Sequence, residues 1–497
     1  MSSESHTGSI KAHDYLAAVI AAALAFVVFF ITRSQSAGWH DSAELALSAW
    51  QLGASHAPGS PLHSLIGYLF SIVAEPYKAT TFLSILTSSL AAGVVALLAG
   101  KLGCKRLAAI GAGALFAFVF PVWPNAVLTE LYALNALCVG LLLMALWHWQ
   151  QRQGSGSLLL GLAVYGLALS AYFANILLVP ALAIFVWRAS PQPLKPLASA
   201  IAGTTIAVGV IALVNVWLAS RVPAVSEINP DSLVNTFLYM TGANHNPLAV
   251  DGVSFMLTRT VEHALSFSAN FLFIGIAAGI FGIVALWKTE RVYTELLLLV
   301  FLTYMGYYTL FGPGDYAYMV APACLVFAVF CGAGFQAFGD RLNNPKLKPV
   351  ATSGALVIAA ALVLLQLPER LAAAADQTPE RYVENTFASM PDDALLLVRW
   401  QQFTTLRYYQ EVHEQRPDVK VSLSVLTPRT YNWGQSDNYI DDVTQQLCNG
   451  KQVLTDKQPN ELPGSFKLVP TDIEGIKSIA GQWQQVVFAN PSEENCS

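Results

Sequence analysis

Residues 38–70 have the sequence GWHDSAELALSAWQLGASHAPGSPLHSLIGYLF, and they follow directly after the first strongly apolar stretch of the chain. The segment combines two acidic residues, Asp41 and Glu44, with three histidines, His40, His56 and His63. A spacer between two apolar segments needs none of these titratable groups. We therefore predict that this segment holds a site for chemistry, and that the apolar segments around it form the fold that presents it.

The composition is that of a membrane protein. Of the 497 residues, 54% are hydrophobic and 12% are charged, whereas soluble domains have about 25% charged residues. Apolar runs of the length that crosses a bilayer, about 20 residues, recur from Tyr15 to Leu367. The first run lacks the basic region and the cleavage site of a signal peptide, so we expect a retained helix. The net charge of −5 and the absence of a basic stripe or P-loop give no indication of nucleic-acid binding.

Eleven apolar segments follow one another, and we predict a polytopic α-helical fold of about eleven transmembrane helices. Loops rich in Lys and Arg mark the cytoplasmic side, and with eleven helices all such loops fall on one side. Two short segments between residues 158 and 187 leave a count of ten open. The segments are 15–32, 80–100, 107–123, 127–149, 158–170, 172–187, 197–219, 267–287, 292–311, 318–339 and 350–367.

The loops 33–79 and 220–266 and the C-terminal region then lie on the outer side of the membrane, opposite the cytoplasm. We predict an inner-membrane protein whose active site and C-terminal domain face the periplasm. Two domains are expected, a transmembrane domain of residues 1–367 and an extracytoplasmic α/β domain of residues 368–497, where the composition becomes polar. Short runs rich in apolar and β-branched residues predict strands at ALLLVRW (394–400), VKVSLSVL (419–426) and WQQVVFA (483–489), and PERYVENTFASM (379–390) predicts a helix.

Residues 40–53, HDSAELALSAWQLG, have helical periodicity. A spacing of three places Asp41 and Glu44 on one face of this helix. HAPGSP ends it, and PLHSLIGYLF predicts a second, amphipathic helix along the membrane interface. A simpler interpretation is that Asp41 caps the first helix and that Glu44 faces water, since Asp is common at helix starts. The Gly-Pro hinge and the histidines in the same loop favour a functional site.

Four blocks of the chain resemble a family of GT-C membrane glycosyltransferases that includes an animal protein O-mannosyltransferase. The first block, within residues 41–62, has the pattern D-x-x-E, L-G and H-x-P-G-x-P-L. The second is LTELYALNAL (128–137), with Glu130, Tyr132 and Asn135. GPGDYAYMVAP (312–322) and YYQEVHEQRPDVKV (408–421) are similar to two further blocks. The blocks span nearly the whole chain in the family's order.

The resemblance implies a reaction as well as a fold. GT-C enzymes take a sugar from a lipid-phosphate carrier at the outer face of the membrane. This chain would then transfer a sugar from a polyprenyl-phosphate donor to a hydroxyl of a protein, lipid or glycan, with inversion. Asp41 would be the general base, and Glu44 would hold the acceptor or a divalent metal, or pair with a histidine. Because one Asp/Glu pair gives little support for a metal site, we predict no metal.

The departing phosphate needs a cation beside it. Arg221, just past the seventh helix, is the first candidate, and Arg259 and His263 are weaker ones. Arg221 is equally well explained as an anchor at the membrane interface. His56 and His63 are predicted to contact the donor or the acceptor, and fixing the Gly-Pro hinge is an equally good explanation for His56.

Four residues of the second and third blocks in chain order are also predicted to contact donor or acceptor. Glu130 and Tyr132 lie at the outer end of the fourth helix, where an ionisable residue is costly unless it is paired. Asp315 and Tyr316 lie in an outer turn, and turn formation alone would explain Asp315.

Two questions stay open. A disulfide between Cys448 and Cys496 is predicted for the outer region, although spacing cannot establish it. A transporter or flippase of lipid-linked sugars, or a non-catalytic envelope scaffold, is the alternative function. Transporters place charge near the bilayer midplane in interrupted helices, whereas here the charges gather at one face, which favours an enzyme.

Overall fold

The computed structural model describes residues 12–224, 228–243, 252–310, 316–423, 443–455, 465–474 and 482–489. The chain divides into two compact units. The first consists of Met1–Arg33, Thr81–Leu213 and Pro247–Ala373, and the second of Ser34–Thr80, Val214–Asn246 and Ala374–Ser497. This division differs from the expected boundary at residue 367, because the loop after the first helix belongs to the same unit as the C-terminal region.

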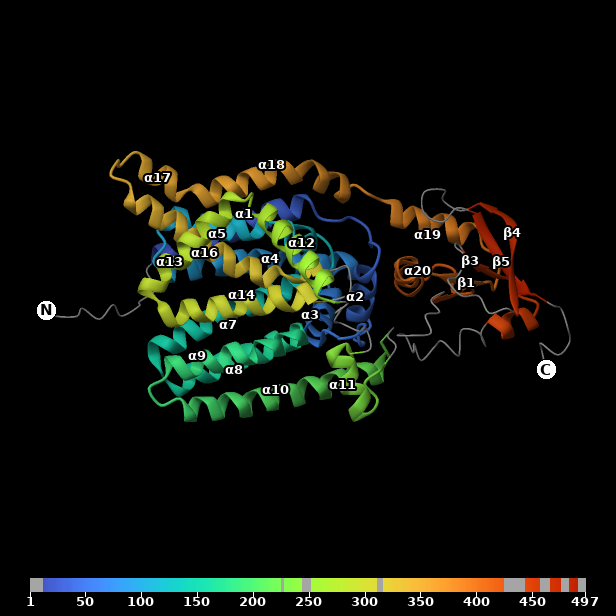
Figure 1. Ribbon diagram of the computed structural model, residues 1–497. Helices are drawn as coiled ribbons and strands as arrows, with labels where there is room; N and C mark the ends of the chain where they lie inside the picture. The colour runs from blue at the N-terminus through green and yellow to red at the C-terminus, as the bar shows by residue number, and fades with distance from the viewer. Residues whose placement is uncertain are drawn as a thin grey trace. The chain divides into compact units, whose positions relative to one another are not determined.

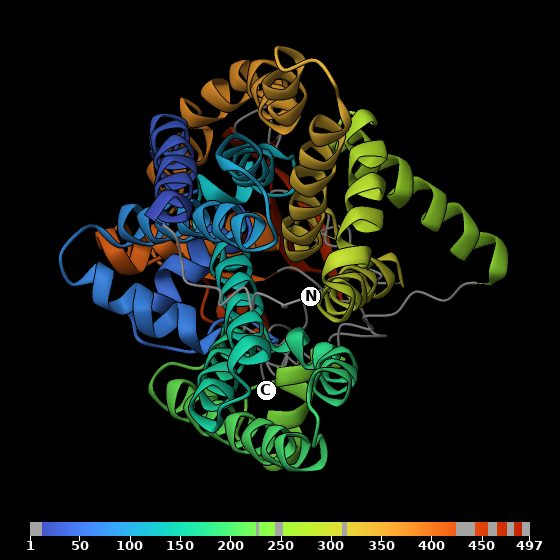
Figure 2. The same ribbon diagram turned by 90° about the vertical axis from the view of Figure 1, so that its left-hand side faces the viewer.

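The first unit is a bundle of apolar helices (Figure 1), seen along the helix axes in Figure 2. A helix occupies each of the eleven predicted apolar segments. The helices are α1 (Ala12–Ile31), α4 (Pro76–Lys101), α5 (Arg106–Phe118), α6 (Trp123–Ala126), α7 (Leu131–Arg152), α8 (Ser155–Ala171), η1 (Phe173–Leu178), α9 (Val179–Ala189), α10 (Leu194–Arg221), α12 (Val253–Asn270), α13 (Ile274–Thr289), α14 (Arg291–Leu310), α15 (Tyr316–Met319), α16 (Ala321–Arg341), α17 (Leu347–Thr352) and α18 (Gly354–Ala374). The ends of α4, α10 and α18 continue into the second unit.

Among the described residues, five helices are long and apolar enough to cross a membrane by themselves. They are α4, α7, α10, α16 and the helix that begins at Gly354. The pair α12 and α13 passes the same test as one span, but it bends by 93° at the break between its halves. Shorter apolar helices lie in the same bundle. The chain is therefore a multi-pass membrane protein, and α12 adds a helix to the region that the sequence predicts as an outer loop.

Close helix packing in this bundle depends on glycine. Helices α13 and α16 lie against each other. A Cβ atom added to Gly282 would lie 1.9 Å from the carbonyl oxygen of Phe330, and one added to Gly334 would lie 1.8 Å from that of Ala278. Without a hydrophobic drive between helices in lipid, such small-residue contacts are a main source of their association.

The second unit contains a five-stranded sheet of order β2-β1-β3-β5-β4. Its strands are β1 (Leu395–Val398), β2 (Lys420–Leu423), β3 (Val453–Thr455), β4 (Phe466–Glu474) and β5 (Gln482–Phe488). β1 pairs in parallel with β2 and β3, with Leu395 opposite Lys420 and Val453, whereas β5 is antiparallel to β3 and β4. The predicted strands at β1, β2 and β5 are confirmed; β3 and β4 were not predicted.

The helices of this unit are α2 (Asp41–Trp50), α3 (Pro61–Ser71), α11 (Leu233–Thr241), α19 (Thr378–Ser389) and α20 (Trp400–His413). The predicted helices at α2, α3 and α19 are confirmed. Side chains of a strand alternate between its two faces, so Leu396 and Val398 of β1 enter one core and Leu395 and Leu397 another. Leu47 of α2 lies in the core of Leu396 and Val398, and burying such a side chain stabilises the fold by about 1.5–3 kcal/mol. The loop after α1 therefore folds as part of this core.

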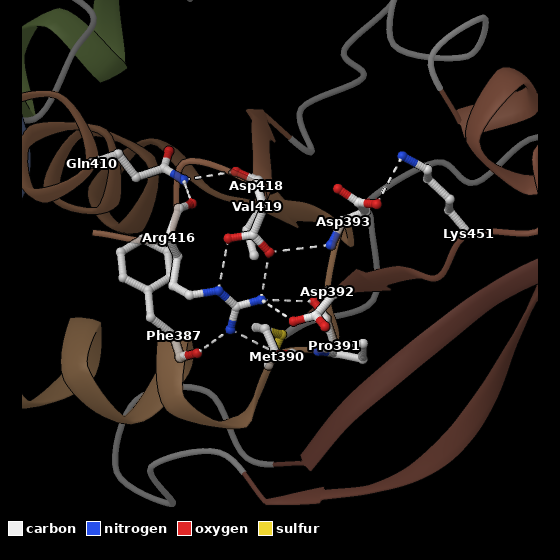
Figure 3. Close-up of polar contacts among 10 residues, drawn as sticks. All are labelled: Phe387, Met390, Pro391, Asp392, Asp393, Gln410, Arg416, Asp418, Val419 and Lys451. Atoms are coloured by element: carbon white, nitrogen blue, oxygen red, sulfur yellow. Dashed lines mark hydrogen bonds and ion pairs between the residues drawn. The ribbon is translucent and has the colours of Figure 1, made fainter. Parts of the chain in front are cut away.

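A group of polar contacts centred on Arg416, which we call the Arg416 clasp, joins separate segments of this unit (Figure 3). The Arg416 guanidinium binds both carboxylate oxygens of Asp418, at 2.9 and 2.7 Å. Its Nη1 also donates to the carbonyl oxygens of Phe387 and Met390, at 2.6 and 3.0 Å. These bonds pin the C-terminal end of α19 to the segment that leads into β2.

Candidate functional site

The site begins at the N-terminus of α2. Asp41 is the first residue of the helix, and His40, with φ 60°, precedes it as the N-cap without a capping side-chain bond. Glu44 is one turn further on and is only 4% exposed. The simpler interpretation from sequence is therefore wrong in both parts, since Asp41 does not cap the helix and Glu44 does not face water.

His56 joins the two carboxylates. Its Nδ1 lies 2.8 Å from Oε2 of Glu44, and its backbone N–H donates to the other oxygen of Glu44 at 2.9 Å. On the far side of the ring, Nε2 lies 3.6 Å from Oδ2 of Asp41. By accepting both hydrogen bonds, the Glu44 carboxylate fixes the backbone and the ring of His56. Glu44 therefore determines where Nε2 of His56 lies.

The C-terminal region supplies the fourth member of the site. The indole Nε1–H of Trp400, at the start of α20, donates to Oδ1 of Asp41 at 2.7 Å. The Trp400 and His56 rings meet edge to face, with centroids 5.7 Å apart. We call Asp41, Glu44, His56 and Trp400 the Asp41 cluster. Trp400 was not predicted, because it lies 359 residues from Asp41 in the chain and nothing in its local sequence marks a partner.

The exposure of the Asp41 side chain, 29%, contrasts with 5% for that of Glu44. Oδ1 of Asp41 is bound to the indole, and Oδ2 is separated from the nearest ring nitrogen by more than an ordinary hydrogen-bond distance. A carboxylate that is held at one oxygen by a neutral indole N–H and is reached by solvent is able to accept a proton from a hydroxyl. The arrangement suits a general base.

The loop between α2 and α3 is held by α11. The Tyr239 hydroxyl donates to the carbonyl oxygen of Ser55, and the backbone N–H of Ala54 donates to the carbonyl of Val222 at 3.1 Å. Gly59 has φ 74°, and a Cβ there would lie 2.6 Å from the Tyr239 ring. The Pro-Gly pair after His56 is therefore needed both for the backbone conformation and for this close approach.

His63 of α3 is 1% exposed, and within the described part of the chain neither of its ring nitrogens has a hydrogen-bond partner. Burial lowers the pKa of His63 from 6.5 to about 4. The side chain is thus a neutral group inside the packing of α3, where the Cβ position of Gly67 lies 3.9 Å from its Cε1.

Residues of the second block lie in the first unit. The backbone of Glu130 exchanges hydrogen bonds with the Ser84 hydroxyl, and the Tyr132 ring meets that of Tyr172 edge to face. Asn135 accepts from Nδ2 of Asn175 at 2.8 Å. This bond joins η1 to α7, although Nδ2 of Asn135 is itself buried without a hydrogen-bond partner in the described part of the chain.

The predicted cations are divided between the two units, with Arg221 in the second and Arg259 and His263 in the first. Arg221 is exposed, with its guanidinium over the Trp217 ring at 5.6 Å, which fits an interfacial anchor. Arg259 lies in the same way over Phe255. His263 is buried, with Nδ1 3.2 Å from the Thr309 hydroxyl. Asp315, the side chain of Tyr316 and Cys496 lie outside the described residues, so their predicted roles and the pairing of Cys448 stay predictions.

No group of three or more metal-ligating side chains placed to hold a metal ion occurs within the described ranges. In the Asp41 cluster the His56 ring lies between the two carboxylates and bonds Glu44 directly. The imidazole thereby occupies the position that a cation shared by the carboxylates would take. In this arrangement the imidazole ring, and no metal ion, joins the two carboxylates.

Comparison with solved structures defines the class. The crystal structure of ArnT from Cupriavidus metallidurans in the apo state matches with a TM-score of 0.58 and 15% identity, over 95% of this chain and 99% of that chain. The structure of the same protein bound to undecaprenyl phosphate matches with a TM-score of 0.58, 13% identity and the same coverage. The chain therefore has the GT-C membrane fold.

Sequence comparison adds a particular relative. A family model described as the protein O-mannosyl-transferase TMEM260 N-terminal domain matches residues 41–195. The mouse protein O-mannosyl-transferase TMEM260 is 32% identical over 120 residues, which cover 23% of this chain and 17% of the mouse protein. The predicted resemblance is confirmed for the region that begins at Asp41 and contains the first two blocks.

Proposed function

We propose that this protein is a glycosyltransferase that moves a sugar from a polyprenyl-phosphate carrier to an acceptor hydroxyl on the outer face of the membrane. The observation that supports it best is the Asp41 cluster at the start of α2, in a chain with the fold of ArnT. The undecaprenyl phosphate bound in one ArnT structure supports the lipid carrier. The name of the mouse relative supports a sugar as the transferred group.

In the proposed reaction Asp41 accepts the proton of the acceptor hydroxyl through Oδ2. The hydroxyl oxygen attacks C1 of the sugar, and a new C1–O bond forms as the bond from C1 to the carrier phosphate breaks. The phosphate oxygen leaves with the bonding electron pair, as polyprenyl phosphate. A single displacement of this kind inverts the configuration at C1, and one positioned base contributes typically about 10²–10⁴-fold to its rate.

The other residues hold this base or its substrates. Glu44 fixes His56, and His56 presents Nε2 toward Asp41 and toward a donor phosphate placed beside it. Arg221 is proposed to assist the leaving phosphate, and Glu130, Tyr132, Asp315 and Tyr316 to contact donor or acceptor, whereas the burial of His63 does not support a contact with substrate. The proposal includes eleven membrane crossings, with α2 and the C-terminal region outside the cytosol. It requires no metal.

The test uses the full-length protein in nanodiscs with a panel of polyprenyl-phosphate sugars and an extract that supplies acceptors. Release of polyprenyl phosphate from one donor, together with a glycoside of inverted anomeric configuration, is the expected result. Movement of intact lipid-linked sugar between the leaflets of sealed proteoliposomes, without release of polyprenyl phosphate, would favour a flippase. Release with retained configuration would contradict the single displacement.

A further inference from the structure

Helix α20 contributes three regularly spaced side chains to the loop that contains Asp41. Trp400, Thr404 and Tyr408 are four residues apart, so they lie on one face of the helix. Trp400 donates to the Asp41 carboxylate at 2.7 Å, and the Thr404 hydroxyl donates to the carbonyl of His40 at 2.7 Å. Tyr408 donates to the Glu75 carboxylate. The three contacts reach both ends of the segment between α1 and α4.

Thr405 adds a fourth contact, from its hydroxyl to the carbonyl oxygen of Gly38 at 3.0 Å. Three of the four contacts fall on residues 38–41, where His40 has a positive φ. Residues other than glycine adopt that conformation only where the surrounding structure enforces it. The α20 contacts provide that enforcement, and they set the direction in which Asp41 leaves the backbone.

We propose that Trp400 is a positioning residue for catalysis, which acts through Asp41; this inference rests on the proposed glycosyl transfer. Its indole N–H occupies Oδ1 of Asp41, so that Oδ2 is the oxygen left to meet the acceptor hydroxyl. A hydrogen bond to the ionised carboxylate also favours the deprotonated form that a base requires. Trp400 thus couples the C-terminal region to the chemistry of the loop.

The groups around Asp41 are few enough to interpret a pH profile. His56 faces it at 3.6 Å, and Glu44 binds the other side of His56. The other ionisable side chains on the helices packed against α2 are His63 and Tyr68 on α3 and Arg407, Tyr408, Tyr409, Glu411 and His413 on α20, and His40 and Arg399 directly precede α2 and α20. Arg407 pairs with Glu411 at 2.9 Å, and His413 lies 3.9 Å from Glu75.

The matched variants are Trp400→Phe and Thr405→Val. Each substitution removes one hydrogen bond from α20 to the same loop. Only the bond of Trp400 is made to the Asp41 carboxylate, whereas that of Thr405 is made to a backbone carbonyl. We expect Trp400→Phe to lower turnover roughly tenfold and to move the acidic limb of the pH–rate profile to higher pH. Thr405→Val should lower thermal stability and leave the limb in place. If the acidic limb lies at the same pH in both variants, the proposal is overturned, because the loss of a merely structural contact shifts the limb in neither variant.

A spectroscopic measurement separates this inference from the function on which it rests. The 11 tryptophans are replaced by 5-fluorotryptophan, and the Trp400 fluorine resonance is identified by its absence in Trp400→Phe. We expect this resonance to titrate at acidic pH in the wild type and to stay constant in Asp41→Asn. Identical titration in both would overturn the positioning role. If the wild type releases no polyprenyl phosphate from any donor, the proposed function fails, and the fluorine titration still decides whether Trp400 senses Asp41.

Discussion

Asp41 and Asp418 belong to the same unit, and both lie in a polar cluster that ties distant segments together, but their partners differ. Asp418 is bound at both oxygens by Arg416, which holds the pKa of its carboxyl well below the usual range. Asp41 is bound by a neutral indole N–H at one oxygen, and the nearest group to the other is the His56 ring at 3.6 Å.

The difference shows what a base requires. A carboxylate in a two-point contact with arginine gains stability from staying ionised and cannot accept a proton near neutral pH. Such a group suits a structural role, and Arg416 also binds three backbone carbonyls near the end of α19. A carboxylate that is fixed by a neutral N–H, as Asp41 is by Trp400, is oriented without the strong stabilisation of its charge that an arginine gives. If the proposed function holds, the Arg416 clasp serves folding and the Asp41 cluster serves the reaction, within one unit.

The largest expected effect is that of Asp41→Asn on turnover. The amide oxygen keeps an acceptor for Trp400, so the fold is retained, but the base is lost, and release of polyprenyl phosphate should fall by about 10²–10⁴-fold. Asp418→Asn is the control, which should lower thermal stability and leave turnover per folded molecule unchanged. A loss of turnover in Asp418→Asn that equals that in Asp41→Asn would remove the distinction between the clusters.

The next effect concerns acid stability. His63 has a pKa of about 4 in the folded protein and an ordinary value of 6.5. Between these values the unfolded chain binds a proton that the folded chain does not, so stability is complete above pH 6.5 and falls as the pH drops toward 4, by about 3 kcal/mol. His63→Leu should remove this part of the pH dependence, as measured by thermal unfolding at pH 7 and 4.5. The same acid loss in wild type and variant would show that His63 is not the group responsible.

A smaller effect is expected from the Arg416 clasp. Arg416→Gln removes the two bonds to Asp418 and those to the carbonyls, and should lower the free energy of unfolding by about 2 kcal/mol. Because the pKa of Asp418 is lowered in the folded state, its contribution is present above the ordinary value of 3.8 and is lost as the pH falls below it. The stability difference between wild type and Arg416→Gln should therefore shrink on acidification. If Arg416→Gln lost turnover but kept its stability, the assignment of the Arg416 clasp to a structural role would be contradicted.

Much of the fold was predictable because membrane helices and strands have strong local signals. Apolar length predicted helices in the bundle, and the helical periodicity of residues 40–53 predicted α2. The weaker predictions concern segments with mixed signals. The helix α12 is amphipathic and ends in a sharp bend rather than in a polar loop, and β3 is only three residues long.

The site was predictable only where its residues are neighbours in the chain. Glu44 and His56 are 12 residues apart and share one loop, so their pairing was among the alternatives. Trp400 reaches Asp41 only because α2 and α20 share a core, and that is a property of tertiary packing. His63 was predicted as a contact for substrate from its residue type, but its burial depends on how α3 packs.

The most direct test of the base role asks whether a nucleophile that carries no proton can replace it. Asp41→Ala, in nanodiscs with the donor identified for the wild type, would be assayed with and without sodium azide. The account predicts that azide restores release of polyprenyl phosphate and yields a glycosyl azide of inverted configuration. Donor binding without any azide-dependent release would contradict the assignment of Asp41 as the general base.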